Sequence, residues 1–217
     1  MSLVALVQAA QKYFPDLRID YKSQSSFMKF IGKLMFFNKQ FLTQYTTTIG
    51  STIYFPNPLF VKIRPVSSSI IILHELCHMY DSSKWGKRVF DFLYLFPQSL
   101  VPLSIPLLIV SWQLSLLFLL FILPFPALFR TYFELRAYMV SLYVMNAVSI
   151  KLELKSTLDV NKEDLVSQFN SSSYYYMFPF TSYIRRKLDA AVVKIKAGQR
   201  PFDSPVFDML DELVKTI

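Results

Sequence analysis

The feature that most constrains the fold is a long uncharged stretch in the middle of the chain. Residues 92–129 contain no Asp, Glu, Lys or Arg and are rich in leucine and phenylalanine. A helix that crosses the hydrocarbon core of a bilayer needs about 20 residues, so this stretch is long enough for two crossings. Prolines at both ends and a polar turn near Ser111, Trp112 and Gln113 favour two short helices over one long helix. The stretch predicts an inserted transmembrane helical hairpin; a buried helical pair is the alternative.

The charge distribution agrees with a membrane surface. Of the 217 residues, 18% are charged, and the formal net charge is +8; soluble domains average about 25% charged residues. Basic residues flank the uncharged stretch on both sides: Lys84, Lys87 and Arg88 before it, Arg130 and Arg136 after it. The positive-inside rule therefore predicts an integral membrane protein with both flanks in the cytoplasm. We find no phosphate-binding loop and no nucleic-acid motif, so the lipid bilayer is the expected partner.

A metal-binding pattern precedes the uncharged stretch. Residues 74–78 read His-Glu-Leu-Cys-His, and His74 and His78 are the only histidines in the chain. On a helix, positions four residues apart lie on one face, so both imidazoles can reach one tetrahedral Zn²⁺. Glu75 would then take a proton from water activated by the metal. A solvated pair of histidines on an ordinary helix is the alternative interpretation.

A third ligand has to come from elsewhere in the chain, because a catalytic zinc site uses three protein ligands and keeps one position open. With no third histidine available, a carboxylate must serve. Glu134 lies between Arg130 and Tyr138 at four-residue spacing, a polar stripe on an apolar helix, and such a stripe faces a site more readily than lipid. Alternatively, Glu134 only pairs with Arg130 at the membrane interface.

Two further residues are candidates for orienting the ligands without binding the metal themselves. Asp81 follows His78 on the same helix face and could orient an imidazole, or it could cap the helix end or pair with Lys84. Arg130 is the corresponding candidate beside Glu134. The shared metal also fixes the topology: a single crossing between His78 and Glu134 would separate them, so an even number of crossings is required.

The other segments predict a mainly α fold with a small β-sheet. Helical spacing of apolar residues covers the ranges 3–13, 26–40, 68–82, 160–169, 183–197 and 205–217. The range 26–40 is apolar and basic, and either lies in the membrane plane or packs on the core. Residues 43–49 and 52–55, on either side of Gly50, predict paired strands, and residues 59–63 predict another strand. Proteases with such a metal helix commonly carry an edge strand beside it, where extended substrate can pair.

These predictions divide the chain into three parts. Residues 1–91 hold the N-terminal helices, the strands and the motif helix of an α+β zincin-like core. Residues 92–129 form the hydrophobic hairpin, and residues 130–217 hold the third-ligand helix and the C-terminal helices that complete the core.

The motif, the double span and the following Glu-Leu-Arg-Ala (134–137) resemble the M48-type membrane gluzincins over about residues 45–145. That group contains a heat-shock protease of bacterial inner membranes and the prenyl-protein (CAAX) endopeptidase. The resemblance implies that His74, His78 and Glu134 hold zinc and that Glu75 is the general base. Tyr138 stands where the family has Asp, and a tyrosine there could stabilise an oxyanion.

The sequence thus predicts a membrane-embedded zinc metalloendopeptidase, with its active site facing the cytoplasm, that hydrolyses a peptide or protein substrate. A different class remains open: a membrane-inserting structural component, for example of a phage particle, that keeps a zincin-like core without proteolysis. A soluble zincin with a buried apolar hairpin is the third possibility.

Overall fold

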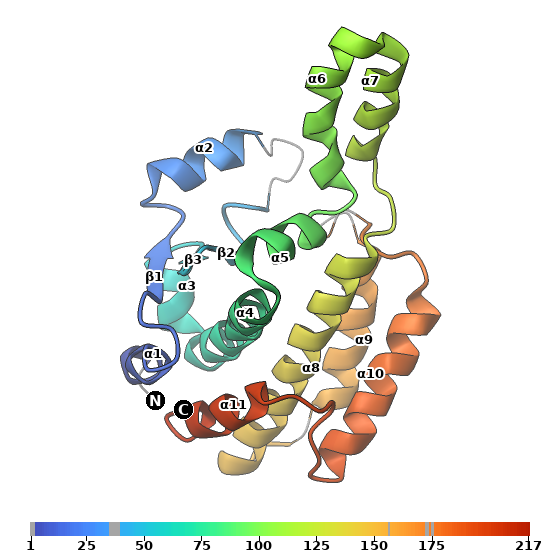
Figure 1. Ribbon diagram of the computed structural model, residues 1–217. Helices are drawn as coiled ribbons and strands as arrows, with labels where there is room; N and C mark the ends of the chain where they lie inside the picture. Colours follow the sequence, from blue (N-terminus) through green and yellow to red (C-terminus); the bar gives the residue numbers. More distant parts are fainter. Residues whose placement is uncertain (1–2, 35–39, 156, 172–173, 175) are drawn as a thin grey trace.

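Two long helices form the centre of the molecule. The computed structural model describes residues 3–34, 40–155, 157–171, 174 and 176–217, and it is mainly helical with one small sheet, as predicted (Figure 1). Helix α4 (Pro65–Trp85) packs along helix α8 (Leu128–Lys151). Proline at the first position favours the start of α4, and Gly86 ends it with a φ of 81°, where other residues are strained.

The N-terminal part packs against α4. It contains α1 (Leu3–Ala10), β1 (Arg18–Tyr21), α2 (Ser26–Leu34), β2 (Thr47–Ile49), β3 (Thr52–Phe55) and α3 (Pro58–Ile63). The predicted strand pair is confirmed as β2 and β3, which are antiparallel around Gly50, whereas the pairing of β1 parallel to β3 was not anticipated. The strand order is β1-β3-β2, which leaves β2 at an edge. Of the predicted helix 26–40, α2 covers the first part, and residues 35–39 lie outside the described residues.

The strand predicted at residues 59–63 is wrong, because this segment forms α3. The Asn57 side chain accepts a hydrogen bond of 2.8 Å from the backbone N–H of Phe60, and Pro58 occupies the first helical position. Both features stabilise a helix start. Local capping therefore outweighs the β-preference of the apolar residues that follow.

The uncharged stretch forms a chain of short helices. These are the end of α5 (Lys87–Tyr94), then η1 (Gln98–Leu103), α6 (Ser104–Val110), α7 (Trp112–Leu119) and η2 (Leu120–Ile122). The chain turns at Ser111, as predicted, and α6 and α7 project from the body as a helical hairpin (Figure 1). Among the described residues no helix alone has both the length and the apolar composition to cross a bilayer; Lys87–Tyr94 and Gln98–Val110 meet these criteria together but bend by 97°. A transmembrane hairpin is therefore not confirmed.

Helix α8 takes part in two cores. Its Ala137 and Val140 are buried with α1, α4, β3 and α11 (Val206–Val214), while Leu135 and Leu142 are buried with α9 (Leu158–Phe169) and α10 (Thr181–Lys196). The three C-terminal helices were predicted, with ends that differ by a few residues. Both cores pack against α8, so the helix is fixed from two sides. The backbone positions of the α8 residues that face α4 are therefore fixed as well.

Candidate metal centre

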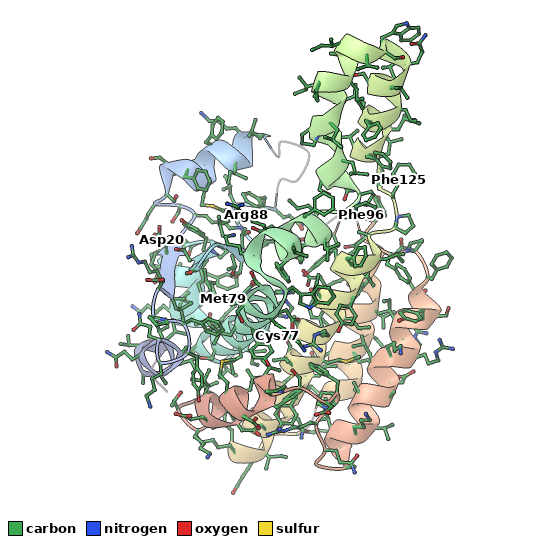
Figure 2. The ribbon with its side chains drawn as sticks, in the orientation of Figure 1. Asp20, Cys77, Met79, Arg88, Phe96 and Phe125 are labelled. Atoms are coloured by element: carbon green, nitrogen blue, oxygen red, sulfur yellow. The ribbon has the colours of Figure 1, made fainter. Side chains whose placement is uncertain are left out.

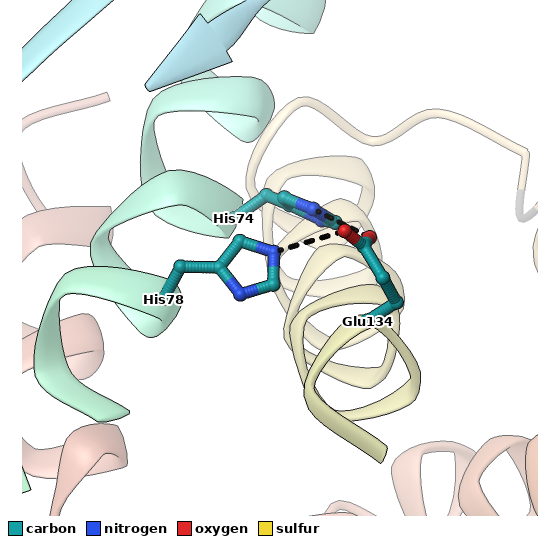
Figure 3. Close-up of side chains that lie close together, drawn as sticks. All are labelled: His74, His78 and Glu134. Carbon is teal, nitrogen blue, oxygen red and sulfur yellow. Dashed lines mark ion pairs between the residues drawn. The ribbon is translucent and has the colours of Figure 1, made fainter. Parts of the chain in front are cut away.

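The three residues predicted as ligands come together between α4 and α8. Figure 3 shows both imidazoles extending from α4 toward the carboxylate of Glu134 on α8. His74 Nε2 lies 3.6 Å from Glu134 Oε2, and His78 Nε2 lies 3.6 Å from Glu134 Oε1. The potential ligand atoms of all three residues lie within 4.8 Å of one another. Ligands at about 2.0–2.1 Å from a tetrahedral zinc are roughly 3.4 Å apart, so the spacing fits one metal ion.

The burial of the three side chains and their unsatisfied hydrogen-bonding atoms also fit a metal site. The side chains of His74, His78 and Glu134 are 11%, 10% and 5% exposed. Within the described part of the chain, both ring nitrogens of His78 and Glu134 Oε2 are buried without a hydrogen-bond partner. Leaving such a group unsatisfied costs about 1–3 kcal/mol, more when it is charged. Two imidazoles and a carboxylate, all facing one point, are a donor set that zinc accepts.

The orientation of His74 is determined by Ser141 on α8. The Ser141 hydroxyl donates to the carbonyl of Ala137 at 3.1 Å, so it accepts from Nδ1–H of His74, also at 3.1 Å. This leaves Nε2 unprotonated and directed at Glu134, which is the form that binds metal. The sequence prediction missed Ser141, although it follows Glu134 by two helical turns and therefore shares its face.

The charges of Glu134 and His78 support each other. Burial alone would raise the pKa of Glu134, but the adjacent His78 and His74 hold it well below its usual range. Burial alone would lower the pKa of His78, but the nearby carboxylates, Glu134 foremost and then Glu75 and Asp81, together raise it. Glu134 is therefore ionised at neutral pH, the state in which a carboxylate binds a metal ion.

Glu75 faces the same open space as the predicted ligands. It is half-buried and lines a cleft of about 710 Å³ together with His74, His78 and Glu134. The edge strand β2 also lines this cleft. The buried Lys22 supports this side of the cleft, since its ammonium donates to the Phe41 carbonyl and to Thr47 Oγ1. Burial lowers the pKa of Lys22 to about 7. Glu75 and the three predicted ligands thus border one cleft.

Tyr94 is a site residue that the sequence prediction missed. Its hydroxyl donates a short hydrogen bond to Glu134 Oε1, and its ring lies edge-on to that of His78, with 5.7 Å between the centroids. Tyr94 belongs to α5, which crosses over α4 and α8 (Figure 1). No spacing rule relates Tyr94 to the motif, because their contact depends on the bend after α4.

The Tyr138 hydroxyl does not lie where the prediction placed it. The Tyr138 ring packs edge-on against His74 with centroids 4.8 Å apart, but its hydroxyl donates to Gln168 Oε1 at 2.9 Å and contacts the Tyr174 hydroxyl. Tyr138 is 7% exposed and does not line the cleft, whereas Tyr174 does. The Tyr138 hydroxyl is therefore bonded to α9 and does not face the cleft, which does not fit an oxyanion role. Arg130 lines the cleft, with its guanidinium over the rings of Tyr94 and Tyr174.

Asp81 contacts α8 instead of a ligand imidazole. Its carboxylate accepts two hydrogen bonds of 2.9 Å from Arg136, and Asp81 is 1% exposed. The prediction that it orients a histidine is corrected accordingly: the facing guanidinium is a stronger partner for a buried carboxylate than a neutral ring. Cys77 points into the apolar core, where burial raises its pKa, and it belongs to no ligand group.

A scan against protein-family models gives no match for this chain, and searches of curated proteins and of solved structures find no similar protein either. His74, His78 and Glu134, with their position in the cleft, are the features of this chain that indicate a function.

Proposed function

We propose that this protein is a zinc-dependent metallopeptidase that hydrolyses peptide bonds at a membrane, of the M48-like gluzincin type that its sequence resembles. The observation that carries the proposal is the buried His74–His78–Glu134 group, whose unpaired nitrogen and oxygen atoms face one point beside Glu75. Three protein ligands leave one position open on a tetrahedral ion, which is the arrangement of catalytic rather than structural zinc sites.

The residues around the site have separate chemical roles in this proposal. When bound, zinc would supply a Lewis acid that polarises a substrate carbonyl and makes water more acidic. Glu75 accepts the proton from the attacking water and passes it to the leaving amine. Arg130 lines the cleft and supplies a fixed positive charge against the negative charge that develops on the substrate.

Strand β2 offers a way to bind the substrate. Residues Thr47–Ile49 line the cleft, and β2 pairs only with β3 in the described sheet. An extended peptide can add to such a free edge through main-chain hydrogen bonds. Binding of this kind selects for extended backbone rather than for one sequence, which suits an endopeptidase.

The decisive experiment separates metal binding from proton transfer. We expect Glu75→Gln to bind one zinc per chain as the wild type does and to cleave a fluorescently labelled unfolded protein at least about 100-fold more slowly. The matched control is Glu163→Gln, an exposed glutamate on α9, which should leave cleavage unchanged. Full activity of Glu75→Gln would overturn the mechanism.

The same preparation tests the rival function. Zinc content is measured by elemental analysis in the wild type and in His74→Ala. If the wild type holds no zinc, or if His74→Ala holds as much as the wild type, the protein is a non-proteolytic, membrane-inserting structural component instead.

A further inference from the structure

The projecting hairpin, residues 98–123, has an apolar outer surface. Its most exposed side chains include Ile105, Leu108, Ile109, Val110, Trp112 and Ile122, with Ile109 90% and Val110 74% exposed. They belong to both limbs and to the tip of the hairpin, and side chains project from all visible sides of it (Figure 2). An apolar surface of this kind marks a contact with a membrane or a partner.

The two fully buried residues of α6 and α7 are serines, beside partly buried Leu107 and Phe118. In α6 the one buried residue is Ser104, and in α7 it is Ser115, which are 4% and 2% exposed. Small hydroxyl residues between two helices allow close approach, and leucine on the outside is the pattern of helices surrounded by lipid. At the tip, the Ser111 hydroxyl donates to Gln113 Oε1 at 2.6 Å, so polar groups there pair with each other.

The length of the hairpin matches one leaflet. The first limb, Gln98–Val110, has six residues of 3₁₀-helix and seven of α-helix, which gives about 22 Å. The second limb, Trp112–Ile122, is about 18 Å long by the same rises. A bilayer with its headgroup regions is about 40–45 Å thick, so its midplane lies roughly 20–22 Å from the outer limit of the headgroups.

Basic residues lie near the base of the hairpin. Lys84, Lys87 and Arg88 are exposed, Lys87 is paired with Asp91 at 2.7 Å, and in Figure 2 Arg88 lies level with Phe96, where the hairpin leaves the body. Helix α2 carries exposed Lys29 and Lys33 next to its exposed phenylalanines. A positive rim near the base of an apolar projection is complementary to a bilayer with anionic headgroups.

We propose that the hairpin inserts into one leaflet of an anionic bilayer and turns near the midplane without crossing, while the basic rim contacts the headgroups. This replaces the two spans expected from the sequence. The inference does not depend on the metal centre, so the failure of either proposal leaves the other standing.

Trp112 at the tip of the hairpin reports the depth directly. The chain has two tryptophans, so Trp85→Phe leaves Trp112 as the single fluorophore in the full-length protein. Vesicles of phosphatidylcholine and phosphatidylglycerol carry lipids brominated near the headgroup, at mid-chain or near the methyl end. We expect the strongest quenching from bromines near the methyl end. Strongest quenching near the headgroup would mean crossing or surface contact, and no quenching would mean no insertion; either result overturns the proposal.

A second measurement tests the hairpin surface itself. Ile109→Asp should weaken vesicle binding, measured by co-sedimentation, roughly 100-fold, because a carboxylate at that depth is costly. The control is Val193→Asp on α10, an apolar residue that is 68% exposed and far from the hairpin, and this variant should bind as the wild type does. Both side chains are exposed, so folding should be preserved, as circular dichroism can check. If Ile109→Asp binds vesicles normally, or if it abolishes a dimer in lipid-free solution instead, the occupant is not lipid.

Discussion

At the scale of single residues, the candidate metal centre depends on one hydroxyl, that of Ser141, which is not itself a predicted ligand. The Ser141 hydroxyl has a single proton, which it donates in a hydrogen bond to the Ala137 carbonyl. The oxygen is therefore left as an acceptor, which selects the His74 tautomer with its proton on Nδ1. Without this acceptor the imidazole could place its proton on either nitrogen, and the ring could rotate.

We therefore expect Ser141→Ala to weaken zinc binding about 10- to 100-fold, the usual effect of losing a residue that orients a ligand. The affinity is measured by competition with a chromogenic chelator. Ser149→Ala, two turns further along α8, is the control and should bind as the wild type does. An unchanged affinity in Ser141→Ala would show that the hydroxyl does not orient His74.

The contrast between predicted and missed site residues has a physical reason. His74, His78 and Glu134 were predictable because helical spacing and the ligand requirement of zinc act along the chain. Tyr94 and Arg136 reach their partners only through the packing of α5 and α8 against α4. Such contacts depend on crossing angles and bends, which no pattern within one segment encodes.

At the scale of elements, α4 and α8 are joined beside the metal centre by a buried ion pair. The side chains of Asp81 and Arg136 are 2% and 15% exposed, and Arg136 also lies over the ring of Phe202 at 4.4 Å. Asp81 is one turn beyond His78, and Arg136 is close to Glu134 along α8. The pair therefore contributes to the helix spacing on which the 3.6 Å contacts at the metal centre depend.

Removal of the Asp81 charge should destabilise the fold. We expect Asp81→Asn to lower the free energy of unfolding by about 3 kcal/mol, because it leaves the Arg136 guanidinium without its counter-charge. Urea denaturation measures the change. Asp159→Asn removes a carboxylate of an exposed pair with Lys196 and should give no measurable change. Equal effects of the two substitutions would contradict a structural role for the buried pair.

The secondary structure was predictable to different degrees along the chain. Helices α4 and α10 were recovered because their apolar periodicity extends over several turns, whereas α8 was predicted only as a helix around Glu134, without bounds. The elements that the sequence did not predict correctly are short. Strand β1 has four residues and is stabilised by pairing with β3. Helix α3 has six residues and is stabilised by the Asn57 cap. In elements of this size a single contact outweighs the intrinsic preference of the residues.

At the scale of the whole molecule, the hairpin is a separable unit. It packs chiefly against itself, and its two ends meet, since the Gln98 side chain donates to the Leu123 carbonyl at 3.4 Å. We expect a chain in which Gly-Ser-Gly replaces residues 98–123 to fold and to bind zinc with unchanged stoichiometry, because the new loop spans a short gap. The same chain should lose vesicle binding.

Elemental analysis and co-sedimentation check the two halves of this prediction. Loss of zinc binding in the shortened chain would mean that the hairpin supports the metal centre. Retained vesicle binding would mean that the basic rim and α2 suffice for membrane contact.

The potential metal-ligand atoms between α4 and α8 also bear on the stability of the protein in a cell. An ion that joins His78 to Glu134 acts as a reversible cross-link between two distant parts of the chain, and it binds the folded chain in preference to the unfolded one. At a free concentration 100 times its dissociation constant, such a ligand adds about 2.7 kcal/mol to the stability of the folded state. Zinc supply would then govern how many copies escape degradation, as well as how many are active.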